Sequence, residues 1–174
     1  MKFLSEQKAL VQLQAIRSAL KSEITENYEL RAKNCLTCET QGACCLDAHF
    51  VNVHISRLEA VTIKKSLSRL STSHQQEIDA RVEAAIEKYS LKADGDTFKQ
   101  TYACPLFEKG LGCLVHEDGK PVPCVMHACY ERAEDLPPDE LQTLAEDQIE
   151  DLNRRTYGHR SPLLPLPLAL RFFR

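Results

Sequence analysis

The grouping of the cysteines constrains this chain more than any other feature of its sequence. Eight cysteines occur among 174 residues, and they fall into two clusters. Cysteines used only as small apolar core residues would be scattered along the chain. The first cluster contains Cys35, Cys38, Cys44 and Cys45, and the second contains Cys104, Cys113, Cys124 and Cys129. Because a Cys-x-x-Cys pair places two thiolates on one metal, and two distant pairs can complete a four-sulfur site, the clustering predicts a metal or iron–sulfur centre.

Length and composition predict a single globular domain. The chain has 27% charged and 43% hydrophobic residues and a formal net charge of −3, with no long basic run, so nucleic acid is not an expected partner. No apolar stretch is long enough to span a bilayer, and the N-terminus is charged too early for a secretory signal. We therefore expect a cytoplasmic protein without a membrane span. Disulfides are rare in that compartment, which favours metal ligation or redox chemistry for the cysteines.

Apolar periodicity predicts a mainly helical chain. Apolar residues recur at steps of three and four in four segments, which we expect to form helices over 3–32, 56–70, 73–89 and 137–155. Two of these helices have capping-box signatures at their starts, Ser56 with Glu59 and Ser73 with Gln76. In the first helix the apolar stripe is expected to extend to Leu30. In the last helix the inward side chains are expected to be Leu141, Leu144, Ile149 and Leu152.

The remaining segments are predicted to be irregular, with short strands at most. A β-prone run covers 50–55, and a second short strand is expected over 111–115 with Asp118-Gly119 as its turn. The expected fold class is therefore mainly α, with irregular cysteine-rich metal-binding loops, in a single domain. Within it we expect an N-terminal helix (1–34), a cysteine-cluster metal-binding region with a helical hairpin insert (35–130), and a C-terminal helix with an apolar proline-rich tail (131–174).

The tail over 161–174 is apolar and interrupted by prolines, so it cannot be one regular helix. Its apolar residues from Leu163 to Phe173 would mark a contact site for a protein partner if they were exposed. Docking onto the protein's own helices is the interpretation that we favour.

All eight cysteines are candidate metal ligands, and the adjacent pair raises a question of geometry. Thiolates suit zinc, iron–sulfur and cuprous centres. Neighbouring side chains in an extended segment point in opposite directions, so Cys44 and Cys45 would serve two centres, or only one of them would ligate. Eight cysteines are enough for two four-sulfur sites. They also allow one such site with the remaining cysteines left unbound. Cys129, at the start of an expected helix, is alternatively a buried thiol.

Other chemistries receive less support from the sequence. His49, His54, His116 and His127 lie near the clusters, and neutral imidazole binds zinc and iron, but each is more typical of a surface or supporting residue. A redox Cys-x-x-Cys normally follows a strand at a helix N-terminus, whereas Cys35 follows a helix. No acid–base pair, nucleophile motif or phosphate-binding glycine loop is present. The sequence therefore does not favour an enzyme.

Several linked elements resemble one known family. Cys35-x2-Cys38-x5-Cys44-Cys45 is followed by Cys104-Pro-Leu-Phe, Gly112-Cys113-Leu-Val-His116 and Lys120-Pro-Val-Pro-Cys124. This order is similar to that of the YkgJ-type cysteine-cluster proteins, described as having a putative zinc- or iron-chelating domain. The chain departs from the family pattern in a longer spacer before Cys44, in Lys120 in place of arginine, and in His116 in place of tyrosine. Cys129 lies outside the pattern.

The resemblance implies ligation by the other seven cysteines but supplies no reaction. We expect a cytoplasmic protein that binds iron, preferentially as an iron–sulfur cluster, or zinc. Its role would be metal handling, redox sensing or electron transfer. The alternatives are a structural zinc-binding interaction module and, because a related cysteine domain occurs in flagellin lysine methylases, an accessory domain of a protein-modifying enzyme.

Overall fold

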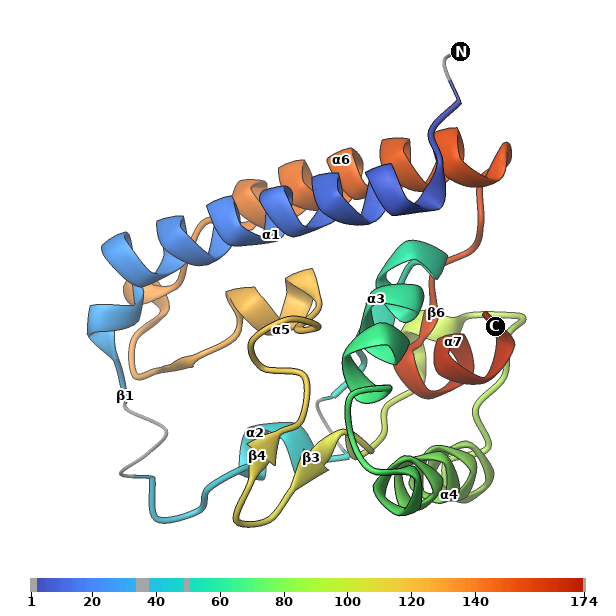
Figure 1. Ribbon diagram of the computed structural model, residues 1–174. Coiled ribbons are helices and arrows are strands. Elements are labelled where there is room, and N and C mark those ends of the chain that lie inside the picture. Colours follow the sequence, from blue (N-terminus) through green and yellow to red (C-terminus); the bar gives the residue numbers. More distant parts are fainter. Residues whose placement is uncertain (1–2, 34–37, 49–50, 174) are drawn as a thin grey trace. The chain divides into compact units, whose positions relative to one another are not determined.

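The computed structural model describes residues 3–33, 38–48 and 51–173 (Figure 1). The helices within these ranges are α1 (Glu6–Asn27), α2 (Ala43–Leu46), α3 (Arg57–Leu67), α4 (Thr72–Lys88), α5 (Val122–Met126), α6 (Asp139–Tyr157) and α7 (Leu166–Phe172). Short 3-10 turns occupy η1 (Glu29–Arg31), η3 (Thr97–Lys99) and η4 (Ala133–Asp135). Within the described residues, no helix is both long enough and apolar enough to cross a membrane.

Among the described residues, the strands are two residues long and form three separate antiparallel pairs. They are β1 (Ala32–Lys33) with β5 (Cys129–Tyr130), β2 (His54–Ile55) with β6 (Leu164–Pro165), and β3 (Phe107–Glu108) with β4 (Gly112–Cys113). The registers pair Lys33 with Cys129, Ile55 with Leu164, and Phe107 with Cys113. The prediction of a mainly helical fold with irregular loops and only short strands is confirmed.

The chain forms two compact units. The first, which we call the α1/α6 unit, comprises residues 1–39 and 121–161, and the second, the α3/α4 unit, comprises residues 40–120 and 162–174. These units do not coincide with the three expected segments. Helix α6 belongs to the α1/α6 unit, whereas the apolar tail after it belongs to the α3/α4 unit.

In the α1/α6 unit, the two long helices pack side by side (Figure 1). The backbone N–H of Leu4 donates to the Arg155 carbonyl at 3.0 Å, which joins the start of α1 to the end of α6. Helix α5 packs against both helices. The buried side chains of the pair are Ala9, Leu13, Arg17, Leu20 and Ile24 from α1, and Ala145, Ile149, Leu152 and Asn153 from α6.

Two side chains expected to face inward are exposed instead. Leu30 is 87% exposed because α1 ends at Asn27, so the helical period that would have turned Leu30 inward is already broken. Leu144 is 59% exposed, because the buried face of α6 runs through Ala145, Ile149 and Leu152. Leu144 is one residue away from that face, about 100° around the helix.

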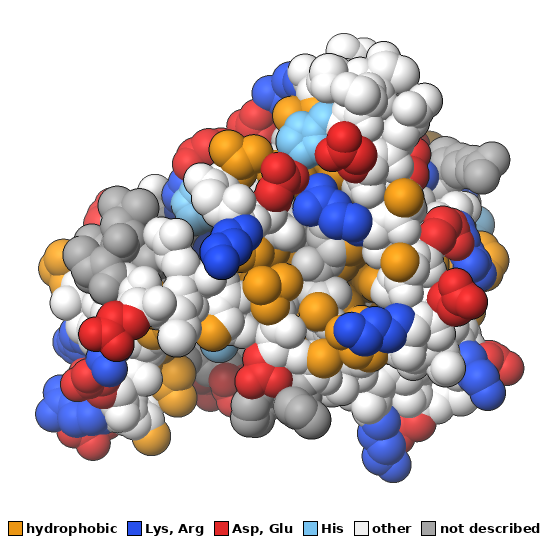
Figure 2. All heavy atoms as spheres, turned by 90° about the horizontal axis from the view of Figure 1, so that it is seen from below, with side chains coloured by type: hydrophobic (Ala, Val, Ile, Leu, Met, Phe, Trp, Pro, Cys, Tyr) orange, Lys and Arg blue, Asp and Glu red, His pale blue; other side chains and the backbone are white. Residues whose placement is uncertain are grey.

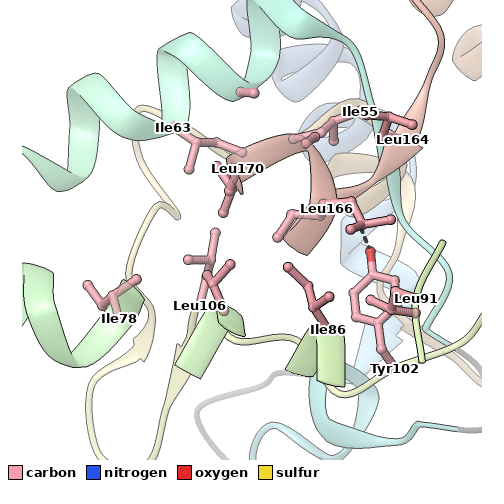
Figure 3. Packing of buried hydrophobic residues seen from close by; sticks show 14 of the residues in the cluster. Ile55, Ile63, Ile78, Ile86, Leu91, Tyr102, Leu106, Leu164, Leu166 and Leu170 are labelled. Atoms are coloured by element: carbon pink, nitrogen blue, oxygen red, sulfur yellow. Dashed lines mark hydrogen bonds between the residues drawn. The ribbon is translucent and has the colours of Figure 1, made fainter. Parts of the chain in front are cut away.

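In the α3/α4 unit, the C-terminal tail lies inside the apolar core (Figure 3). Helix α7 packs on α3 and α4, and Leu166, Leu168 and Leu170 are buried there beside Ile63 and Ile86. Docking of the tail onto the protein's own helices is therefore the observed arrangement. Of the large apolar side chains of the tail, Leu163 and Phe172 are exposed.

A buried tyrosine fastens the tail to the preceding loops. The Tyr102 hydroxyl donates to the Val53 carbonyl and accepts the backbone N–H of Leu166 at 3.1 Å. The same Leu166 N–H donates to the Val53 carbonyl at 2.9 Å. Tyr102 therefore joins the segment before β2 to the segment after β6, and its buried hydroxyl is hydrogen-bonded at both.

Helix starts were predicted well at one serine and wrongly at another. The capping box of Ser56 and Glu59 is present, and α3 follows it directly. Helix α4, however, begins at Thr72, because the side chain of Ser71 accepts the backbone N–H of His74. Ser71 therefore provides the N-cap in place of Ser73. The competing serines are two residues apart, so the sequence alone did not distinguish them.

The predicted strands are shorter than expected, and one turn lies elsewhere. Of the run 50–55, only His54 and Ile55 form a strand, and Phe50 lies outside the described residues. The hairpin around Cys113 pairs β4 with the preceding β3, so its turn falls at residues 109–111 and not at Asp118-Gly119. Gly110 and Gly112 adopt φ angles of +90° and +86°, which a tight turn requires and which glycine adopts without strain.

Candidate metal centre

In the α3/α4 unit, the backbone brings part of the first cysteine cluster next to part of the second. Cys44 and Cys45 lie on the short helix α2, and the backbone N–H of Cys104 donates to the carbonyl of Cys45 at 2.8 Å. Residues almost sixty positions apart in the sequence are thus neighbours. This unit contains four of the cysteines, Cys44, Cys45, Cys104 and Cys113.

Cys104 and Cys113 flank the β3–β4 hairpin. The Phe107 N–H donates to the Cys104 carbonyl at 3.4 Å, and Phe107 is the register partner of Cys113. Both cysteines pack against the apolar core. The pKa of the Cys104 thiol is raised to about 11, mainly by burial and to a smaller extent by the nearby Cys113. Burial also raises the pKa of Cys113. At neutral pH both groups are protonated unless a cation or metal compensates the thiolate charge.

The adjacent cysteines lie on a helical turn and not in an extended segment. Helix α2 spans Ala43–Leu46, and its N-cap Gly42 has the left-handed φ of +82°. Successive side chains on a helix are about 100° apart, compared with about 180° in a strand. The premise that Cys44 and Cys45 point in opposite directions is therefore wrong for this segment.

The α1/α6 unit holds the other described cysteines, in a different setting. Cys129 lies on β5 opposite Lys33 of β1, and not at the start of a helix as expected. The Lys33 ammonium forms an ion pair with Glu131 at 2.8 Å. Glu131 is the main cause of the raised pKa of Lys33, and Cys129 and Cys38 add to it, so both cysteines lie within electrostatic reach of that ammonium. Cys124 is on α5. Cys35, the remaining candidate, lies outside the described residues.

The candidate histidines differ in exposure. His116 and His127 are exposed, and the His116 ring lies 3.9 Å from the Glu117 carboxylate. His54 is buried, and its ring stacks on Phe98 with 4.2 Å between ring centroids. His49 lies outside the described residues. On the face drawn in Figure 2, the described acidic and basic side chains are interspersed rather than gathered into a patch of one sign.

The donor set fits a thiophilic metal in its chemistry. The seven described cysteines are thiols. Among residues 3–33, 38–48 and 51–173, however, no three His, Cys, Asp or Glu side chains are placed together as a ready-made ligand set. A bound metal would therefore have to draw the thiols of one unit together. Such coupling between site formation and folding is usual for thiolate sites.

Two residues that hold these segments in place were not singled out from the sequence. The backbone of Gly42 lies directly against the ring of Phe107, so closely that a Cβ at position 42 would overlap the ring. The loop position of Gly42 beside the adjacent cysteines was an available signal. Nothing in the sequence pointed to its contact with Phe107.

No protein-family model, curated protein or solved structure matches this chain.

Proposed function

We propose that this is a cytoplasmic metal-binding protein that binds iron, preferentially as an iron–sulfur cluster, through its clustered cysteines. Its role is metal handling, redox sensing or electron transfer. The observation that supports this most is the backbone hydrogen bond from Cys104 to Cys45, which makes one member of each cysteine cluster neighbours within one unit. The resemblance of the cysteine pattern to the YkgJ-type family points in the same direction.

The chemistry of the buried thiols supports metal binding over thiol catalysis. A catalytic thiol needs a depressed pKa and access to its substrate. Cys104 has a pKa of about 11 and packs against the apolar core. A thiophilic metal displaces the thiol proton and binds the thiolate directly, so a high pKa is compatible with ligation. When bound, an iron–sulfur centre supplies one-electron redox chemistry, and zinc supplies a cross-link or a Lewis acid.

A structural zinc module is the second candidate, and one observation favours it. The segments that carry the cysteines have little regular structure of their own, since α2 has four residues and the strands have two. Such segments gain most from a cross-linking metal, because the metal contributes folding free energy directly. In this case the metal would hold the loops in place and take no part in a reaction.

Anaerobic purification of the full chain, followed by iron, zinc and acid-labile sulfide analysis, tests the proposal. A brown protein with visible absorption and matching iron and sulfide supports the cluster. A colourless protein with stoichiometric zinc would instead establish the structural module. If the chain retained neither metal after purification and also failed to take up iron with sulfide, or zinc, on reconstitution, the proposal would be wrong.

A further inference from the structure

We propose that residues 162–173 also dock onto the α3/α4 unit of a second copy of this chain, so that two copies exchange this segment and form a dimer. The segment contains β6 and α7, and we call it the docking tail. In the structure it lies on its own copy. The core residues that receive it, which we call the acceptor surface, include Val53, Ile55, Ile63, Ile86 and Tyr102.

The docking tail and the chain before it belong to different units. Helix α6 and the residues after it, through Ser161, are part of the α1/α6 unit, whereas residues 162–174 are part of the α3/α4 unit. The core of the α3/α4 unit is therefore completed by a segment that enters it from the other unit. Because a second copy carries the same tail and the same core, its tail can make every one of these contacts.

The connection that precedes the docking tail is suited to act as a hinge. Helix α6 ends at Tyr157 and β6 begins at Leu164, and residues 158–163 between them form neither helix nor strand. Gly158 has a φ of +79°, and Ser161 is the one buried residue of this connection. A new path for the connection therefore disturbs little packing. Short connections between packed elements are the places at which domain exchange occurs.

The backbone of the docking tail is recognised in the way that a sheet edge recognises an added strand. Strand β6 pairs antiparallel with β2, with Ile55 opposite Leu164. The Leu166 N–H donates to the Val53 carbonyl at 2.9 Å and to the Tyr102 hydroxyl at 3.1 Å. Within the described residues, β2 pairs with no strand other than β6. Release of the tail therefore opens an edge that an identical segment can close again.

The side chains of the docking tail make it an apolar ligand with a restricted shape. Leu166, Leu168 and Leu170 are buried in the core of the α3/α4 unit, and Figure 3 shows the first and the last of them among its isoleucines. Pro165 is the N-cap of α7, and Pro167 lies in the first turn of this helix. Because proline has a fixed φ, the tail loses less conformational entropy on docking than a flexible segment would.

One ion pair makes the docking sensitive to charge. The Arg171 guanidinium of the tail lies 3.3 Å from the Glu83 carboxylate on α4, and both side chains are partly exposed. Either charge can therefore be reversed at the surface without placing a charge in the core. Arg171→Glu alone puts two carboxylates opposite each other, and Glu83→Arg alone puts two guanidinium groups there. When these two variants exchange tails, each acceptor surface again faces the opposite charge.

Mixing the full-length variants Arg171→Glu and Glu83→Arg tests the proposal. The variants, one of them labelled with nitrogen-15, are incubated together at high concentration in the transition region of urea unfolding, diluted, and analysed by native mass spectrometry. We expect the ratio of mixed to self-paired dimers to exceed the ratio for random pairing by about threefold, because two ion pairs are restored at once. The double variant, labelled and unlabelled, is the matched control and should pair at random.

Two results would overturn the proposal. Random pairing of the two single variants would show that the dimer does not form by exchange of the tail. A wild type that stays monomeric after the same treatment would show that the tail docks on its own copy alone.

A conservative variant decides the question if circular dichroism shows that either charge reversal is unfolded. Arg171→Lys keeps the ion pair and allows a carbodiimide to couple position 171 to Glu83. In a mixture of labelled and unlabelled protein, cross-links that join a labelled to an unlabelled peptide support the exchange. Cross-links confined to peptides of the same label overturn it.

Discussion

The two units place the same residue type in different surroundings. In the α3/α4 unit, Cys104 and Cys113 pack against an apolar core, and burial opposes their ionisation. In the α1/α6 unit, Cys38 and Cys129 lie near an exposed ammonium, that of Lys33, beside a two-residue strand pair. The cysteines of the first setting therefore depend on the packing of the unit around them. Disturbing the packing of the α3/α4 unit is the way to break this comparison, and truncation of a core side chain should have the largest effect.

The largest loss of stability is expected when a side chain is truncated in the core that packs against the buried cysteines. Leu166 is 2% exposed, so Leu166→Ala should lower the free energy of unfolding by about 2–5 kcal/mol. The control is Leu111→Ala, because Leu111 is 67% exposed and its truncation should change stability by less than about 0.5 kcal/mol. Urea unfolding followed by circular dichroism measures both. Equal losses in the two variants would contradict the described core.

The contact between Gly42 and Phe107 should give the next largest effect. Both Gly42→Ala and Gly95→Ala place a Cβ at positive φ, +82° and +74° respectively, which costs about 1–2 kcal/mol in either case. At Gly95 no atom lies within 4 Å of the added Cβ, whereas at Gly42 the Cβ meets the Phe107 ring. Gly42→Ala should therefore lower the melting temperature more. Equal shifts would show that the ring does not fix α2.

A smaller loss of stability is expected when the hydroxyl that joins the tail to the core is removed. Tyr102→Phe removes the bond to the Val53 carbonyl and should cost about 1 kcal/mol. The loss is moderate because the Leu166 N–H also donates directly to Val53 at 2.9 Å. Chemical denaturation of the variant checks this value. A loss comparable to that of Leu166→Ala would mean that the tail depends on Tyr102 alone.

The smallest effect is the pH dependence contributed by His54. Burial lowers the pKa of this histidine in the folded protein below the ordinary value of 6.5, although the backbone carbonyls of Asn52 and Thr97 act against the shift. Between the two pKa values the unfolded chain binds the proton more readily than the folded protein does. The contribution of neutral His54 to the free energy of unfolding is therefore fully present above pH 6.5 and decreases as the pH falls through that value. Unfolding measured from pH 7.5 to 5 should show this decrease, and His54→Gln should flatten the profile.

Some of this architecture could be predicted from the sequence because it is encoded locally. The mainly helical character follows from the apolar periodicity, and the start of α3 follows from the Ser56–Glu59 capping box. The grouping of the cysteines was also evident. Neighbouring serines, in contrast, did not reveal that Ser71 and not Ser73 caps α4.

The rest depends on long-range contacts that no local pattern specifies. Arg17 lies on the buried face of α1, although a charged residue there predicts exposure. The helical turn at Cys44 and Cys45 starts after Gly42, whose backbone lies against the ring of Phe107, sixty-five residues away in the sequence. The hydrogen bond from Cys104 to Cys45 likewise joins two loops whose pairing no spacing rule supplies.

X-ray absorption spectroscopy at the metal edge tests the central claim most directly, because it reports the atoms bound to the metal in the full-length protein. The account predicts a first coordination shell composed of sulfur at about 2.3 Å, as thiolate ligation requires. An iron–sulfur cluster would add a short metal–metal distance, which a mononuclear zinc site lacks. A first shell dominated by nitrogen or oxygen at about 2.0–2.1 Å would contradict the claim that the clustered cysteines bind the metal.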